Sequence, residues 1–131
     1  MSKKEIIKEL DKQDMQELLK KAIIEKKIVV VKFTAQWCGP CQRIKADCYT
    51  MFNQLPDKII VADLDVDLDK NCEFYGFMKR KRLVNGIPVL MAWAPKIDRP
   101  FWYVPDESVT GGDIHQIKAF LQRVFQVSLS I

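Results

Sequence analysis

The sequence predicts an α/β domain, in which helices cover a sheet that contains buried parallel strands. Residues 28–34 form an apolar run broken by one charge, which is typical of a strand buried on both faces. Residues 14–23 and 113–124 instead repeat apolar residues at helical spacing. An Ile-Pro at residues 87–88 opens another apolar run. Strand-like and helix-like segments therefore alternate along the chain, which favours this fold class.

The composition is that of an ordinary globular protein. Hydrophobic residues make up 48% of the 131 residues, and charged residues make up 29%. A chain of this length typically forms one domain, which we place at residues 1–131, and no disulfide or metal is needed to stabilise it. The net charge of +4 permits acidic partners without requiring nucleic acid. Nucleic acid is therefore not an expected partner.

Cysteine usage and the N-terminal residues predict the compartment. Residues 1–10 carry five charges and no apolar core of signal length, so we expect no export signal. No stretch approaches the roughly 20 apolar residues of a membrane span, so we expect no membrane partner. In a reducing compartment, a Cys-x-x-Cys more often indicates redox chemistry or metal binding than a structural bridge. We expect a cytoplasmic protein.

The first elements are a short segment of uncertain type and a helix. Residues 5–10 fit either an edge strand or the start of a helix. Asp11 can cap the helix that follows, and Asp14 in its first turn complements the helix dipole. Apolar residues at helical spacing give this helix a buried face: Met15, Leu18, Leu19, Ala22 and Ile23.

Residues 37–41 read Trp-Cys-Gly-Pro-Cys and lie between the buried strand and a helix expected at residues 39–53. At a helix N-terminus, unpaired N–H groups and the positive end of the helix dipole favour a negative sulfur. The thiolate is the form that attacks a disulfide, so this placement activates Cys38. Pro40 suits the first turn, because its missing N–H would have had no partner there. The motif therefore predicts a redox-active dithiol of Cys38 and Cys41.

A second buried strand is expected at residues 61–67, where apolar residues alternate with aspartates. A calcium loop would also need a glycine and a distal glutamate, which are absent, so we expect the later aspartates to lie in a solvated turn. Structural zinc needs two closely spaced pairs of ligands, and the sequence has one such cysteine pair. We therefore expect no metal and no organic cofactor.

Three further residues could carry chemistry. Cys48 and Cys72 belong to no second Cys-x-x-Cys, and we interpret both as buried or half-buried thiols that pack as small hydrophobes. The alternative for Cys72 is a regulatory thiol, because a helix start favours the reactive thiolate. His115, the only histidine, is expected on the exposed face of the last helix, which argues against a Cys-His catalytic pair.

Two stretches stand apart from the regular pattern. Residues 79–82 are four consecutive cations, either a solvated helix end or a basic rim that attracts acidic partners. Residues 101–104 are a strand-like aromatic run between prolines, which we interpret as an edge strand with one buried face and, alternatively, as a partner surface. Asp113 then caps the last helix, whose buried stripe is Ile114, Ile117, Phe120, Leu121 and Val124.

The motif at residues 37–41 resembles the active site of thioredoxins residue for residue, and the resemblance covers most of residues 5–125. Residues 29–36 and 61–67 resemble the central strands of that family, and residues 86–90 resemble its cis-proline loop. The resemblance implies a thioredoxin-like fold, with a mixed sheet of about five strands flanked by helices. It also favours a strand within residues 5–10 and a cis bond between Ile87 and Pro88.

The resemblance implies a thiol–disulfide oxidoreductase that reduces protein disulfides through a dithiol–disulfide cycle of Cys38 and Cys41. The Gly-Pro between the cysteines resembles reductants rather than oxidases or isomerases. Protein disulfides are the implied substrates, and a thioredoxin-reductase-like protein is the implied electron donor. The residues implied to contact substrate are Trp37, Gly39, Pro40, Ile87 and Pro88.

Two charges depart from the family pattern. Lys32 stands where most thioredoxins have a buried aspartate, and Asp63 stands on the neighbouring strand where some have a lysine. We hypothesise that Asp63 relays the proton of Cys41 while Lys32 favours the Cys41 thiolate, which places both with the cysteines among the catalytic residues. The alternative is that Lys32 extends to the strand end and meets solvent.

A second function, of another class, is a partner-binding scaffold in which redox activity is secondary. Its surface would consist of the basic residues 79–82 and the aromatic residues 101–104.

Overall fold

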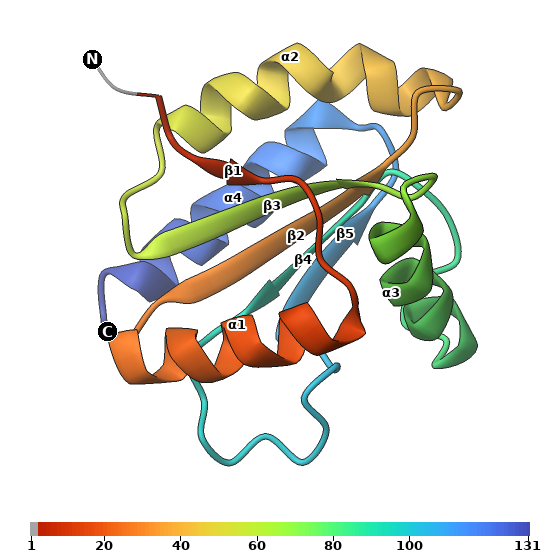
Figure 1. The fold of residues 1–131 in the computed structure, drawn as a ribbon. Coiled ribbons are helices and arrows are strands. Elements are labelled where there is room, and N and C mark those ends of the chain that lie inside the picture. The colour runs from red at the N-terminus through yellow and green to blue at the C-terminus, as the bar shows by residue number, and fades with distance from the viewer. Residues whose placement is uncertain (1–2) are drawn as a thin grey trace.

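The computed structural model describes residues 3–131 as a five-stranded mixed sheet flanked by helices (Figure 1). In chain order the elements are β1 (Ile6–Ile7), α1 (Lys12–Glu25), β2 (Ile28–Thr34), α2 (Gly39–Asn53), β3 (Ile59–Asp65), α3 (Asp69–Arg80), β4 (Val89–Trp93), β5 (Glu107–Thr110) and α4 (Ile114–Ser128). The strand order is β1-β3-β2-β4-β5. The first three of these strands are parallel, while β4 and β5 run antiparallel to their neighbours. The predicted α/β class, the mixed sheet and the early edge strand are confirmed.

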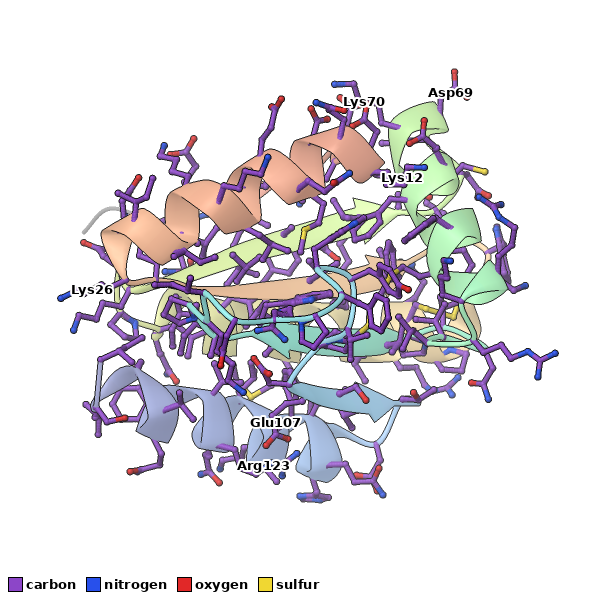
Figure 2. The ribbon with its side chains drawn as sticks, turned by 90° about the horizontal axis from the view of Figure 1, so that it is seen from below. Lys12, Lys26, Asp69, Lys70, Glu107 and Arg123 are labelled. Carbon is purple, nitrogen blue, oxygen red and sulfur yellow. A yellow bond between two sulfur atoms is a disulfide. The ribbon has the colours of Figure 1, made fainter. Side chains whose placement is uncertain are left out.

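The helices divide between the two faces of the sheet. Figure 2 shows α1, with Lys12 and Lys26 at its ends, on the same side as α3, and α4 on the opposite side. Alternate residues of β2 point to opposite faces, as the pleat requires. Val29, Val31 and Phe33 pack with α1 and α3, whereas Ile28 and Val30 pack with α2 and α4. The continuous apolar run of β2 is therefore explained by burial on both faces.

The predicted helix caps are present. The side chain of Asp11 accepts the N–H of Asp14 at 2.7 Å, and the side chain of Asp14 accepts the N–H of Asp11 at 3.1 Å, which completes a capping box. Asp113 accepts the N–H groups of His115 and Gln116 at the start of α4. That helix runs to Ser128, one turn beyond the residue-124 limit of the sequence prediction. The caps satisfy N–H groups that have no partner within the helix.

The prediction of an edge strand at residues 101–104 is wrong. The edge strand is β5, and residues 101–103 form a turn. The rings of the consecutive residues Trp102 and Tyr103 both pack on Phe77 of α3, with centroids 5.5 and 5.3 Å away. In a strand, consecutive side chains point to opposite faces, so this packing is incompatible with a strand. The aromatic residues cover α3 instead of extending the sheet.

Among residues 3–131, no helix combines the length and the apolar content that a membrane crossing requires.

Candidate active site

The two cysteines of the motif occupy the N-terminus of α2. Cys38 is the N-cap residue, and its Sγ accepts the backbone N–H of Cys41 at 3.3 Å. Cys38 and Cys41 form a disulfide with Cα atoms 5.2 Å apart, and Pro40 lies in the first turn as predicted. Cys38 is 6% exposed and Cys41 is 0% exposed. Cys38 is therefore the sulfur that an incoming disulfide can reach, and the helix N-terminus favours its thiolate.

The loop between α3 and β4 approaches these sulfurs. The Ile87–Pro88 peptide bond is cis, as predicted, and the carbonyl oxygen of Ile87 lies 3.8 Å from the Sγ of Cys38. The carbonyl of Pro88 accepts the N–H of Gly111 at 2.8 Å. A Cβ added to Gly112 would lie 3.0 Å from the Cβ of Pro40, so only glycine fits there without a shift. The glycine pair at residues 111–112 thus borders the motif.

Trp37 forms the exposed rim of the site. Its side chain is 69% exposed, and its indole N–H donates to the Oδ2 of Asp67 at 2.9 Å. The backbone N–H of Asp67 in turn donates to the Oδ1 of Asp65 at 2.9 Å. Sequence reasoning placed Asp67 only in a solvated turn and missed this contact. The hydrogen bond sets the orientation of a large apolar ring beside Cys38.

Lys32 and Asp63 form a buried ion pair in the core of the sheet. They are direct partners in the register of β2 and β3, and the Nζ of Lys32 lies 3.2 Å from the Oδ1 of Asp63. Lys32 is 0% exposed and Asp63 is 6% exposed. The alternative in which Lys32 reaches solvent is therefore wrong. The positions of both residues in the pleat place their side chains on the face that α2 and α4 cover.

Two further side chains, neither of which was predicted, contact this ion pair. The hydroxyl of Tyr49 donates to the Oδ2 of Asp63 at 2.5 Å, and the Nζ of Lys8 lies 3.9 Å from the same oxygen and donates to the Tyr49 hydroxyl. Burial and the hydrogen bond to Asp63 raise the pKa of Tyr49 well above its ordinary value, so Tyr49 stays a donor. The side chain of Asp63 is thus contacted by three groups, those of Lys32, Tyr49 and Lys8.

A small cavity joins the ion pair to the first turn of α2. It has a volume of about 130 Å³, and its lining includes Lys32, Asp63, Tyr49 and Gln42. This is room for several water molecules between polar walls. Gln42 also donates from its side-chain amide to the carbonyl of Ala35 at 2.9 Å, just before the motif. The cavity thus extends from Asp63 to Gln42, the residue that follows Cys41.

A family model and solved structures match this arrangement. The model of the thioredoxin family matches residues 6–96, which is more than half of the chain. The chain belongs to the thioredoxin family. Solved thioredoxins from Malassezia sympodialis and Trichomonas vaginalis superpose with TM-scores of 0.68 and 0.67 at 18% and 24% sequence identity. They cover 94% and 91% of this chain, and the matches span 93% and 96% of theirs, which confirms the predicted thioredoxin-like fold.

Curated thioredoxins match over shorter segments. The thioredoxin of Geodia cydonium is 45% identical over 62 residues, which are 47% of this chain and 54% of that protein. Thioredoxin H-type 2 of Nicotiana tabacum is 43% identical over 54 residues, which are 41% of this chain and 43% of that protein. The chain thus spans about half the length of the curated relatives that it matches.

The remaining cysteines of this family member differ from each other. Cys48 is buried, and burial raises the pKa of its thiol to about 11. Cys72 is exposed near the start of α3, so its interpretation as a buried or half-buried thiol is wrong. His115 is exposed, as predicted. Within residues 3–131, no group of three or more His, Cys, Asp or Glu side chains is arranged to hold a metal ion.

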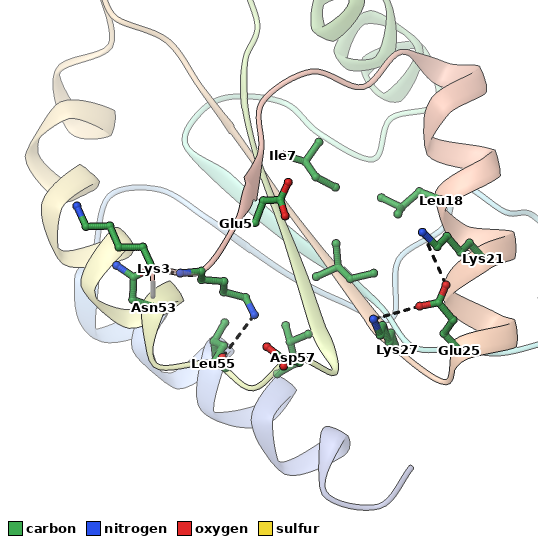
Figure 3. Close-up of a pocket in the computed structure, with 13 residues that line it drawn as sticks. Lys3, Glu5, Ile7, Leu18, Lys21, Glu25, Lys27, Asn53, Leu55 and Asp57 are labelled. Atoms are coloured by element: carbon green, nitrogen blue, oxygen red, sulfur yellow. Dashed lines mark hydrogen bonds and ion pairs between the residues drawn. The ribbon is translucent and has the colours of Figure 1, made fainter. Parts of the chain in front are cut away.

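A larger hollow lies at the opposite end of this thioredoxin-like sheet (Figure 3). It has a volume of about 540 Å³ and lies between the end of α1, the end of α2 and the start of β3. Glu25 forms ion pairs there with Lys21 and Lys27, and the Nζ of Lys4 donates to the carbonyl of Leu55. None of the residues predicted for the site lines this hollow, so it is separate from the cysteine chemistry.

Proposed function

We propose that this protein is a thiol–disulfide oxidoreductase that reduces protein disulfides. The observation that carries the proposal is the Cys38–Cys41 disulfide at the N-terminus of α2, facing the carbonyl of Ile87 before the cis-proline. Membership of the thioredoxin family supports it. The arrangement supplies an accessible sulfur that favours the thiolate, and a second sulfur close enough to displace the substrate.

The cycle consists of two exchanges. The Cys38 thiolate attacks one sulfur of the substrate disulfide, forms a mixed disulfide and releases the other substrate sulfur as a thiolate, which takes up a proton. The thiolate of Cys41 then attacks the Sγ of Cys38 and displaces the second substrate thiolate. Two electrons pass to the substrate, and the protein is left with the Cys38–Cys41 disulfide. A thioredoxin-reductase-like donor then restores the dithiol.

The substrate chain would lie along the rim around Cys38. Trp37 supplies an exposed apolar ring, and the exposed Gly39 and Pro40 leave room for a close approach. The half-buried Ile87, ahead of the buried Pro88, would pair its backbone with an extended substrate segment. Backbone pairing does not depend on the substrate's side chains, so this contact suits many protein disulfides.

Cys41 must lose its proton before it can attack, and we assign this task to the buried ion pair. Asp63 relays the proton through the adjoining cavity, while the positive charge of Lys32 favours the thiolate. Asp63→Asn should therefore slow the second exchange and change its dependence on pH between about 6 and 9. Tyr49→Phe keeps the charges of Lys32 and Asp63 and removes only the hydrogen bond from Tyr49 to Asp63. It therefore separates loss of the proton relay from loss of the hydrogen bonds around Asp63. An unchanged pH profile in Asp63→Asn would show that the relay assignment is wrong.

The cysteine roles are tested by reduction of a disulfide-bonded model peptide. Cys38→Ser should abolish the reaction, and Cys41→Ser should accumulate the mixed disulfide, which mass spectrometry detects. Cys72→Ser, which removes an exposed thiol elsewhere, is the matched control and should react at the wild-type rate. A reduction potential near the value of about −270 mV typical of thioredoxin would support a reductant, whereas a value near about −180 mV would indicate an isomerase or oxidase.

The scaffold alternative, in which redox activity is secondary, is not favoured, because the chain keeps both cysteines at bonding distance in a family-typical site. A Cys38→Ser/Cys41→Ser variant that kept full biological activity would reverse this preference. We also propose a cytoplasmic location, since Cys48 and Cys72 are both free thiols. Fractionation of cells that express the protein tests the location.

A further inference from the structure

Two segments that depart from the regular sequence pattern meet on one surface. Phe77, near the end of α3, stacks on Trp102 with an interplanar angle of 6° and a centroid distance of 5.5 Å. Tyr103 packs edge-on against the same ring. The Nζ of Lys81 lies 5.3 Å from the Tyr103 centroid and 5.7 Å from the Phe77 centroid. The basic residues 79–82 and the aromatic residues 101–104 thus form one basic–aromatic surface.

An ion-pair clamp holds the aromatic half of this surface in place. The guanidinium of Arg99, whose side chain is 12% exposed, donates to both carboxylate oxygens of Asp106 at 2.8 and 3.0 Å. It also donates to the carbonyls of Val104 and Ala94 at 2.7 and 3.1 Å. A two-pronged contact of this kind fixes the loop geometry. Phe101, which is 58% exposed, is therefore presented to solvent by an ordered loop.

The basic half carries four consecutive cations, a number equal to the net charge of the whole protein. The chain has 21 Lys and Arg residues and 17 Asp and Glu residues, so the excess is +4. Residues 79–82 contribute four cations, and the rest of the chain carries 17 charges of each sign. Within residues 3–131, no carboxylate lies within 4.0 Å of these four cations, whereas Lys96 and Arg99 nearby are paired with Asp106. The positive potential is thus concentrated here and is not neutralised locally.

The basic half of this surface lies within reach of the candidate active site, whereas the aromatic half follows the end of β4 that lies away from the cis-proline (Figure 1). Arg82 precedes Ile87 by five residues, and five residues span at most about 18 Å when fully extended. The carbonyl of Ile87 lies 3.8 Å from the Sγ of Cys38. An extended protein segment of five or more residues bound at Cys38 can therefore reach the basic half of the surface.

We propose that the basic–aromatic surface binds an acidic segment, with an apolar side chain for contact with Phe101, in the disulfide-bonded proteins that this protein reduces. The substrate part of this inference rests on the proposed function. A nucleic acid fits less well, because bases stack on open rings and Trp102 and Tyr103 are half-buried against Phe77. Charge contacts attract the acidic segment, and Phe101 gives it an apolar anchor.

Binding is measured first without redox chemistry. The probe is a fluorescent, cysteine-free peptide rich in glutamate with one phenylalanine, and its fluorescence anisotropy reports binding at about 50 mM salt. The test variant is Lys79→Ser/Arg80→Ser/Arg82→Asn, which keeps Lys81 on its rings and places an asparagine where φ is 60°. The matched control, Lys20→Ser/Lys21→Ser/Lys118→Ser, removes the same charge from exposed positions on α1 and α4.

The test variant should bind the peptide about tenfold more weakly than wild type, because each exposed ion pair changes affinity by a factor of about two. The control should stay within about twofold of wild type. Equal weakening in both variants, or tighter binding of a single-stranded oligonucleotide than of the peptide, would overturn the proposal.

The substrate assignment is tested by comparing two disulfide peptides, one with the acidic tail and one with a glutamine tail. The wild type should reduce the acidic peptide several-fold faster, and the test variant should lose this preference. If both peptides are reduced at equal rates, the substrate assignment is wrong and the proposed function stands. If the acidic peptide binds but neither disulfide is reduced, the proposed function and the substrate assignment both fail.

Discussion

Replacing Asp63 with asparagine should destabilise the protein strongly, because it leaves a fully buried ammonium without its counter-charge. Lys32 is 0% exposed, and its Nζ has one carboxylate within 4.0 Å among residues 3–131, that of Asp63 at 3.2 Å. Removing one partner of a buried ion pair typically costs about 3–5 kcal/mol. We therefore expect the free energy of unfolding of Asp63→Asn to fall by about 4 kcal/mol, out of the roughly 5–15 kcal/mol of a typical domain.

Lys32→Met should cost less than Asp63→Asn. The carboxylate that it leaves behind still accepts the Tyr49 hydroxyl at 2.5 Å and lies 3.9 Å from the Nζ of Lys8, which is 58% exposed. We expect a loss near the lower end of the range, about 3 kcal/mol. The double variant Lys32→Met/Asp63→Leu should come within about 1 kcal/mol of wild type, since apolar residues of similar volume replace a buried ion pair at little cost.

Urea unfolding measures these differences. With a slope of about 2 kcal/mol per molar urea, a loss of 4 kcal/mol lowers the midpoint by about 2 M. The control is Lys70→Met, because the Nζ of Lys70 lies at the same 3.2 Å from Asp14 in a pair whose side chains are 53% and 31% exposed. Its loss should stay below about 1 kcal/mol. If Asp63→Asn and Lys70→Met gave equal midpoints, the charge-burial argument would be refuted.

Two further predictions concern Asp106 and the free thiols. Burial opposes ionisation of Asp106, but hydrogen bonds from Arg99, the N–H of Ala94 and Lys96 outweigh it and lower the pKa to about 2. Its folded pKa is depressed, so its stabilisation is full above the unfolded value of about 4 and is lost as the pH falls toward 2. Urea midpoints measured across this window should fall more for wild type than for Asp106→Asn, and parallel curves would contradict the assignment. Iodoacetamide at about pH 8 should modify Cys72 and leave Cys48 unmodified in the oxidised protein, because Cys48 is buried and its thiol has a pKa of about 11. Peptide mass mapping shows which cysteine is labelled. Labelling of Cys48 at a rate similar to that of Cys72 would contradict its burial.

Local signals made the active-site helix predictable. The span of α2, the capping position of Cys38 and the place of Pro40 follow from an apolar strand that meets a helix-forming segment. The pairing of Lys32 with Asp63 could also be predicted from the sequence, because the family resemblance aligned their two strands. The register of β2 and β3 places the two residues side by side. Such features depend on residues close in sequence or on one strand alignment.

The contacts that were missed join residues far apart in the chain. The Trp37–Asp67 hydrogen bond, the approach of Gly112 to Pro40 and the Tyr49–Asp63 contact each depend on how separate elements pack. The aromatic residues 101–104 have the composition of a strand, yet the ring of Phe77 and the Arg99–Asp106 clamp hold them in a turn. Composition was outweighed there by packing.

The sequence by itself determined the α/β class, the helix caps and the cysteine motif, because periodicity, capping chemistry and residue spacing act over a few residues. Only the tertiary structure decided that Lys32 is buried without access to solvent, that Cys72 is exposed, and that the basic and aromatic segments share one surface. Burial and charge pairing depend on which elements meet in space, and pairwise packing between distant segments is not encoded in any local pattern.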